Sequence, residues 1–206
     1  MSRESIHYWK CDRRSAFHGI RREEKPKLSE SELRAALEDS LGRPIVSMDF
    51  KESPGNHLIW LVTVDVKSAV PEYLVRVEDG PEGDGYLAVE SFLLDKVRGE
   101  GVSTPRVIAC DSSRKRSSFA WQLLENIPHP NLQHWHERGE LPLLDLAPSI
   151  GASIARWQQV PVAGFGPFRT EFVHERATLK GYHAAYADYF NLNLKQHLQL
   201  LRDNAF

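Results

Sequence analysis

A single cation stands inside an apolar run near the middle of the chain, and it limits how this part of the sequence can fold. The run extends from Tyr73 to Val77, is typical of a β-strand, and holds Arg76 in its interior. Fourteen residues further on, Glu90 lies in a segment with helical spacing, where Leu87 and Leu94 share its face. A carboxylate on an apolar face is costly to bury without a cation beside it. We therefore predict an ion pair between Arg76 and Glu90, although for these two residues alone an ordinary structural ion pair is the simpler interpretation.

The pattern around this pair predicts an α+β lobe over residues 28–125. A helix separates the third predicted strand from the fourth, occupies residues 86–98, and ends at Gly99. In the second strand, large apolar residues recur at every second position, which indicates one buried face. The five predicted strands lie at residues 45–50, 58–66, 73–77, 107–110 and 119–124. We expect a five-stranded antiparallel sheet with this one helix inserted.

The segment before the sheet combines a charged extension with one further helix. Residues 1–27 are rich in charge and have no helical or strand period, so we expect a partly disordered extension. Its aromatic residues are not interleaved with the basic ones as in a nucleic-acid-binding module, so a nucleic acid partner is not favoured. Ser29 and Glu32 have the spacing of a helix-capping box, and Gly42 is placed to end the helix that they begin.

The pattern changes after residue 125. The Pro-rich residues 126–131 suit neither a helix interior nor a central strand and are predicted to be a linker. Beyond it, Ile150, Ile154 and Trp157 recur at helical spacing, and Pro148 suits the first turn of their helix. Residues 164–167 are predicted to be a loop, and the apolar stripe from Leu179 to Leu201 one long helix or two consecutive ones. We expect residues 132–206 to be the start of a helical lobe.

Composition narrows the possible partners and compartments. The formal net charge of the 206 residues is −2, which favours neither nucleic acid nor an acidic membrane as a partner. The two cysteines, Cys11 and Cys110, lie far apart, as is usual in a reducing compartment. No apolar run approaches the roughly 18 residues of a membrane helix, and the N-terminus lacks the apolar segment of a secretory signal. We therefore expect a cytoplasmic protein.

The cluster of His129, His134 and His136 is best interpreted as a solvated polar loop, and no metal ligand is predicted.

The order of three strands, one helix, two strands and a linker into helices resembles the small lobe of the kinase-like fold. The motifs are similar to those of the aminoglycoside phosphotransferase and choline-kinase-like family of small-molecule kinases. The resemblance covers residues 29–206. The matching motifs are Gly55-Asn56, Leu74-Val-Arg76, Glu90, Gly101-Val-Ser-Thr-Pro105, Leu123-Leu-Glu125, Ile127-Pro128, and Ile150-Gly-Ala-Ser-Ile-Ala155 before Gly164-Phe-Gly166.

The resemblance implies a nucleotide site and a role for each matched residue. Arg76 would contact the α- and β-phosphates of ATP or GTP bound with Mg²⁺, and Glu90 would hold Arg76. The hairpin with Gly55 and Asn56 would cover the phosphates, with a plain hairpin turn as the alternative. The backbone from Glu125 to Ile127 would meet the adenine. The second substrate would be a small molecule with a hydroxyl group.

The catalytic loop of that family is absent from the sequence. The family uses an Asp with an Asn five residues later, and a second Asp for Mg²⁺. In that family the Asp follows His-Gly or His-Asn. Asp145, Asp188 and Asp203 follow the linker here, and none has such a His before it, although Asn193 lies five residues after Asp188. We therefore predict no catalytic residue and an inactive chain that corresponds to the N-terminal portion of such a kinase. Its incomplete helical lobe should expose apolar surface and either self-associate or be marginally stable. The alternative is a non-catalytic nucleotide-binding or protein-interaction module.

Overall fold

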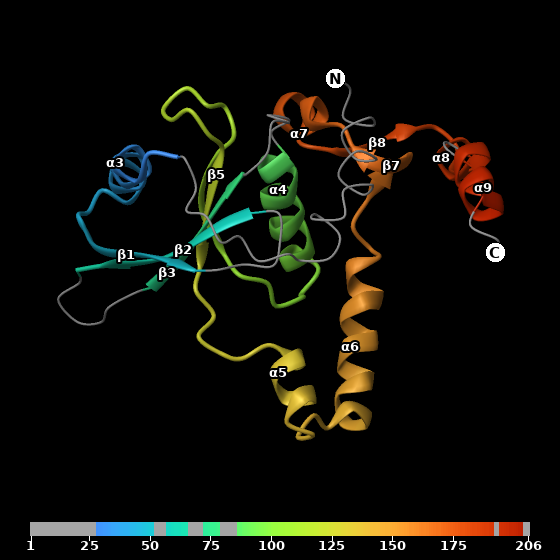
Figure 1. The fold of residues 1–206 in the computed structure, drawn as a ribbon, viewed down its shortest axis with the longest axis horizontal. Helices are drawn as coiled ribbons and strands as arrows, with labels where there is room; N and C mark the ends of the chain where they lie inside the picture. Colours follow the sequence, from blue (N-terminus) through green and yellow to red (C-terminus); the bar gives the residue numbers. More distant parts are fainter. Residues whose placement is uncertain (1–27, 52–56, 66–71, 79–85, 192–193, 204–206) are drawn as a thin grey trace.

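The computed structural model describes residues 28–51, 57–65, 72–78, 86–191 and 194–203 and has an α+β fold (Figure 1). A five-stranded sheet has the order β1-β2-β3-β5-β4, and each neighbouring pair is antiparallel. The predicted sheet and the order of its elements are confirmed. Its strands are β1 (Ile45–Lys51), β2 (His57–Val64), β3 (Glu72–Glu78), β4 (Val107–Asp111) and β5 (Trp121–Glu125).

Helix α3 (Glu30–Leu41) begins and ends at the predicted residues. The Ser29 side chain accepts a hydrogen bond from the Glu32 backbone N–H at 3.2 Å. Gly42 adopts φ 62°, where a side chain would be strained, and its N–H donates to the Glu38 carbonyl. The Glu32 carboxylate does not complete the capping box. It accepts hydrogen bonds from the Ser118 backbone N–H at 2.6 Å and hydroxyl at 3.2 Å, and so ties α3 to the β4–β5 loop.

The two faces of the sheet are covered by different helices. Alternation along β2 places every second side chain on the face that packs against α3, where Trp60 is 2% exposed. Helix α4 (Tyr86–Gly99) covers the opposite face and contacts β4 and β5 (Figure 1). The core under α3 consists of Leu33, Ala36, Leu37, Ile45, Leu58, Trp60, Val62, Val64, Val75, Val77, Phe119, Trp121 and Leu123. Charged residues on β3 that face α4 therefore lie between the sheet and a helix.

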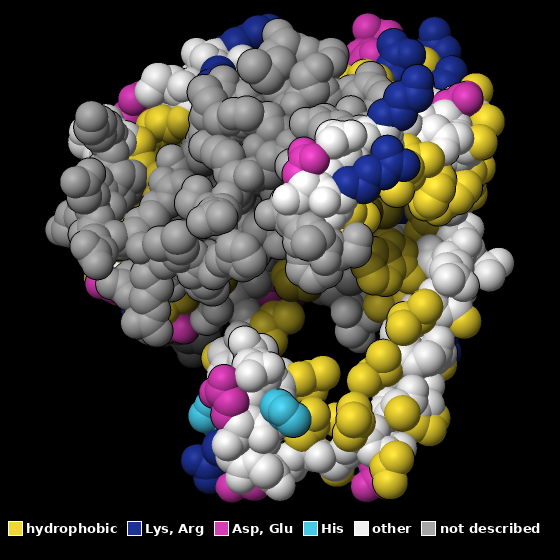
Figure 2. Space-filling view, turned by 45° about the vertical axis from the view of Figure 1, so that its right-hand side comes forward, with side chains coloured by type: hydrophobic (Ala, Val, Ile, Leu, Met, Phe, Trp, Pro, Cys, Tyr) yellow, Lys and Arg dark blue, Asp and Glu magenta, His cyan; other side chains and the backbone are white. Residues whose placement is uncertain are grey.

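The segment after the sheet leads into a helical hairpin. Residues 126–131 form neither helix nor strand, as predicted, and α5 (Leu132–Glu137) and α6 (Leu143–Trp157) follow. The prediction that Pro148 lies in the first turn is wrong, because it lies inside α6. The missing N–H is tolerated there because none of the residues of α6 is buried and water can reach the helix backbone. Figure 2 shows hydrophobic side chains along this helix beside an open hollow.

The prediction of a loop followed by helices between residues 164 and 201 is wrong in part. A small sheet of order β6-β8-β7 forms, in which β8 is parallel to β6 and antiparallel to β7. The later part of the predicted stripe is helical, with one helix at residues 186–190 and another at residues 194–203. The elements of this region are β6 (Val162–Ala163), β7 (Phe165–Phe168), α7 (Thr170–Arg176), β8 (Leu179–His183), α8 (Tyr186–Phe190) and α9 (Leu194–Asp203).

A close backbone approach explains why residues 179–183 form a strand. A Cβ atom at Gly181 would lie 2.3 Å from the Phe165 carbonyl oxygen, so only glycine lets β8 approach β7 so closely. Leu179 and Tyr182 have helical spacing, but Leu179 is buried against α4 instead, in a cluster with Val89, Val97 and Val160. The contact that decides the conformation is therefore not local in sequence.

Among the described residues, no helix has both the length and the apolar composition needed to cross a membrane.

Candidate functional site

The predicted ion pair between β3 and α4 is present. Arg76 Nη1 lies 2.9 Å from Glu90 Oε2, and the two side chains are 24% and 28% exposed. Arg76 stands opposite Ile59 on β2 and Gln122 on β5, so the cation projects from the middle of the sheet. Glu90 Oε1 lies 3.9 Å from Nε2 of His57, at the start of β2. Three titratable groups from two strands and one helix therefore meet on the α4 face.

A buried chain of hydrogen bonds lies beside the ion pair. Arg76 Nη1 donates to Gln122 Oε1 at 3.2 Å, and Gln122 Nε2 donates to Ser91 Oγ at 2.7 Å. Ser91 Oγ in turn donates to the Leu87 carbonyl at 2.8 Å. Gln122 is 0% exposed, so both ends of its amide are satisfied inside the protein. Because the Nε2 end is held by Ser91, the Oε1 end must face the guanidinium.

The contact between Arg76 and Glu90 is an ion pair without a well-aligned hydrogen bond. Glu90 Oε2 accepts no hydrogen bond of good geometry from the described residues, although Arg76 Nη1 is within ion-pair range. Arg76 Nε and Nη2 make no hydrogen bond to those residues either. A guanidinium has five N–H donors, and those left over are suited to an anionic oxygen.

An apolar cavity of about 290 Å³ opens beside the ion pair. Among the described residues, Arg76 and Glu90 are the only charged ones in its lining, and the other walls come from α4, from the segment after it, and from the end of α6. The remaining lining residues are Leu93, Leu94, Val97, Val102, Thr104 and Trp157. The cavity therefore presents one polar end and a largely apolar body.

The residues predicted to meet adenine lie at the far end of the strand that holds Gln122. Tyr73 pairs with Glu125 and Arg76 with Gln122, so Glu125 is about 10 Å along the sheet from the ion pair at roughly 3.3 Å per residue. The Glu125 N–H donates to the Arg106 carbonyl at 2.9 Å, and the Asn126 N–H donates to the Glu72 carbonyl at 3.4 Å.

Ile127 differs from its neighbours in having a free main-chain donor. It is 52% exposed, and its N–H makes no hydrogen bond to the described residues. Of the residues implied by the resemblance, the structure thus brings Arg76 and Glu90 together, and it places Glu125 at the end of β5 with Ile127 two residues beyond it. Gly55 and Asn56 lie outside the described residues.

Three participants were not predicted from the sequence. Gln122 is a polar residue in an otherwise apolar strand. Its position could have indicated a buried polar contact, as the position of Arg76 did. His57 and Trp157 carried no local signal, because each reaches the site from a different element.

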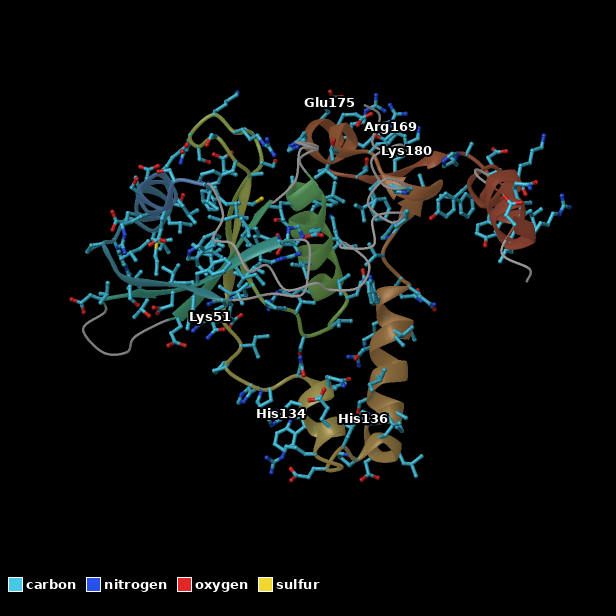
Figure 3. All side chains as sticks on the ribbon, viewed as in Figure 1. Lys51, His134, His136, Arg169, Glu175 and Lys180 are labelled. Atoms are coloured by element: carbon cyan, nitrogen blue, oxygen red, sulfur yellow. The ribbon has the colours of Figure 1, made fainter. Side chains whose placement is uncertain are left out.

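No group of three or more His, Cys, Asp or Glu side chains that could hold a metal ion occurs in the described part of the chain. Figure 3 shows His134 and His136 on α5, far from Arg169, Glu175 and Lys180 at the α7–β8 end.

Comparisons of the chain with protein-family models, with curated proteins and with solved structures found no match.

Proposed function

We propose that this chain binds the phosphates of a nucleoside triphosphate at Arg76, as a lobe related to the aminoglycoside phosphotransferases would. The observation that carries the proposal is the 2.9 Å ion pair between Arg76 on β3 and Glu90 on α4. Kinase-type sites use a strand cation held by a helix carboxylate to position the phosphates of ATP. The insertion of α4 between the third and fourth strands of a five-stranded sheet supports the same assignment.

The free donors define how such a ligand would be held. Arg76 Nε and Nη2 would donate to phosphate oxygens, while Glu90 and Gln122 keep the guanidinium in place. The Ile127 N–H would donate to the base, since the neighbouring N–H groups of Glu125 and Asn126 are already used. In this proposal Mg²⁺ arrives with the phosphates, where it would neutralise part of their charge.

We expect the chain as given to bind without transferring a phosphoryl group. No Asp beyond residue 131 follows a His-Gly or His-Asn dipeptide, so the catalytic-loop motif of this chemistry is missing from these 206 residues, even though Asn193 lies five residues after Asp188. The hydroxyl-bearing substrate that the resemblance implies would be phosphorylated only if another polypeptide supplied those catalytic groups. ATP-dependent turnover by the pure chain above the buffer rate would contradict this expectation.

Calorimetric titration of Mg·ATP and Mg·GTP into the whole chain tests the binding. Arg76→Ala should weaken the tighter nucleotide at least tenfold, because a charge-assisted contact contributes about 1.5–3 kcal/mol. Arg138→Ala is the matched control, since Arg138 forms an exposed ion pair with Glu140 at 2.7 Å and lies on the α5–α6 turn. No binding at millimolar nucleotide, or equal weakening by both variants, would refute the proposal.

A protein-interaction module is the second candidate, and the exposed face of α6 favours it. Ile150, Ile154 and Trp157 are 36%, 47% and 53% exposed, and an apolar face of this kind usually marks an interface. We expect the chain to self-associate through this face. Light scattering that finds a monodisperse monomer at high micromolar concentration would contradict it.

A further inference from the structure

The cavity beside Arg76 has walls that are held in place by hydrogen bonds within the protein. The Val102 N–H donates to the Val97 carbonyl at 3.3 Å, and Thr104 Oγ1 donates to the Leu94 carbonyl at 3.4 Å. The segment after α4 is thereby fastened against α4, and the cavity lies between them. A preformed, largely apolar cavity with few polar groups is the usual form of a small-molecule site.

The third wall is supplied by the C-terminal end of α6. Arg156 Nη1 donates to the Gly101 carbonyl at 3.1 Å, which places the neighbouring Trp157 against the cavity. Trp157 and Val102 also line a second cavity of about 360 Å³. The other residues of that cavity are Leu132, Leu146, Ser149, Ile150, Ser153 and Ile154. An apolar path therefore runs from Arg76 past Trp157 to the α5–α6 hairpin.

The polar end of this path selects the charge of a ligand. Arg76 has donors at Nε and Nη2 that no described residue uses, whereas Glu90 Oε2 is buried behind it. An anionic head group can therefore accept hydrogen bonds from the guanidinium, whereas a cationic one would lie against its positive charge. The walls beyond Arg76 offer mostly aliphatic and indole surface, which suits a hydrocarbon body and not a second charged group.

We propose that this cavity binds an amphipathic carboxylate, with its acidic head on Arg76 and its aliphatic chain directed along α4 toward Trp157. Such a ligand complements both ends of the cavity. The site is separate from the adenine position at Ile127, but it shares Arg76 with the proposed phosphate site, so the two ligands compete.

Titration calorimetry with octanoate, 1-octanol and acetate separates the head from the chain. Octanoate should bind at least tenfold more tightly than 1-octanol, and acetate should not bind detectably. Affinity should rise about fourfold with each methylene from hexanoate to octanoate, as expected for burial of hydrocarbon. Equal affinity for octanoate and 1-octanol, or no octanoate binding at millimolar concentration, would overturn the proposal.

Matched variants locate the ligand. Arg76→Gln should reduce octanoate affinity to that of 1-octanol, whereas Arg138→Gln should leave it unchanged. Trp157→Ala should weaken octanoate at least threefold, whereas Trp135→Ala should not, because Trp135 is similarly exposed and lines neither cavity. Equal effects within either pair would refute the assignment.

A filling variant and a competition measurement complete the test. Val102→Phe leaves Arg76 intact and should lower octanoate affinity at least tenfold by occupying the cavity, while unchanged affinity would overturn the proposal. Saturating Mg·ATP should displace octanoate if the nucleotide also binds at Arg76. Octanoate binding in a chain that binds no nucleotide would support this inference and refute the proposed function.

Discussion

The sheet lobe and the region after the linker bury their apolar side chains to different extents. In the sheet lobe, the described strands and α3 share a closed core in which Val62, Val75 and Leu123 are 0% exposed. After residue 126, the buried apolar side chains among the described residues are Val160, Pro167 and Leu179. The second region is therefore held mainly by its contact with α4, and its remaining apolar surface is available for other contacts.

Truncation of one large aliphatic side chain in each region should give the largest difference in stability. Leu123→Ala should lower the free energy of unfolding by about 2–5 kcal/mol, because it leaves a cavity in a closed core. At a concentration where the chain is monomeric, Ile154→Ala on the exposed face of α6 should change it by no more than about 0.5 kcal/mol. Urea denaturation measures both. A large effect of Ile154→Ala would mean that α6 is covered in solution, and the comparison would fail.

A glycine pair tests whether the small sheet is a separate, weaker unit. In Gly181→Ala, the new Cβ would collide with the Phe165 backbone, so we expect β7 and β8 to separate at a cost of about 1–3 kcal/mol. Hydrogen exchange should accelerate over residues 162–183 and remain slow in β2, β3 and β5.

The matched control for this substitution is Gly151→Ala inside α6. A Cβ at Gly151 would meet nothing within 4 Å, so the change should be neutral or stabilise the helix by up to about 1 kcal/mol. If Gly181→Ala also accelerated exchange in the five-stranded sheet, the two regions would unfold as one unit.

Two glutamines compare a buried with an exposed hydrogen-bonded side chain. Gln122→Leu removes the amide between Arg76 and Ser91 and should destabilise the sheet lobe by about 1–2 kcal/mol, since it leaves a half-buried guanidinium with one partner fewer. Gln133→Leu on α5 removes an exposed bond to Glu137 and should change stability by less than about 0.5 kcal/mol. Thermal unfolding of both variants measures the difference, and equal melting temperatures would show that the buried chain of bonds adds nothing.

Local patterns predicted the elements of the sheet lobe because their periods and helix caps are set by residues near in sequence. The spacing of Ser29 and Glu32 was sufficient to locate the start of α3. The period of two along β2 was sufficient to identify that strand and its buried face. The Arg76–Glu90 pair was predictable for a related reason, since a charge in an apolar run requires a counter-charge. Trp157 and the β8 strand were not, because their positions depend on contacts with elements remote in the chain.

The smallest expected effect concerns the acid response of the second region. The pKa of Glu171 is lowered, chiefly by a hydrogen bond with its own backbone N–H and also by Arg169, whose Nη2 lies 2.6 Å from Oε1. A carboxylate with a lowered pKa in the folded state stabilises that state above its ordinary pKa, and the contribution is lost as the pH falls through the folded-state value. Because the Glu171 side chain is 40% exposed, solvent screening keeps this contribution within about 0.5 kcal/mol.

Hydrogen exchange in α7 between pH 6 and pH 3 measures this contribution. After correction for intrinsic exchange, protection should fall on acidification in the wild-type chain and fall less in Glu171→Gln, which has no carboxylate to protonate. Glu175→Gln is the control, since Glu175 lies on the same helix and forms no ion pair in the described part of the chain. It should respond as the wild type does. Identical acid responses of all three proteins would mean that the Arg169 contact does not hold α7 in solution, and that the second region relies on its packing against α4 alone.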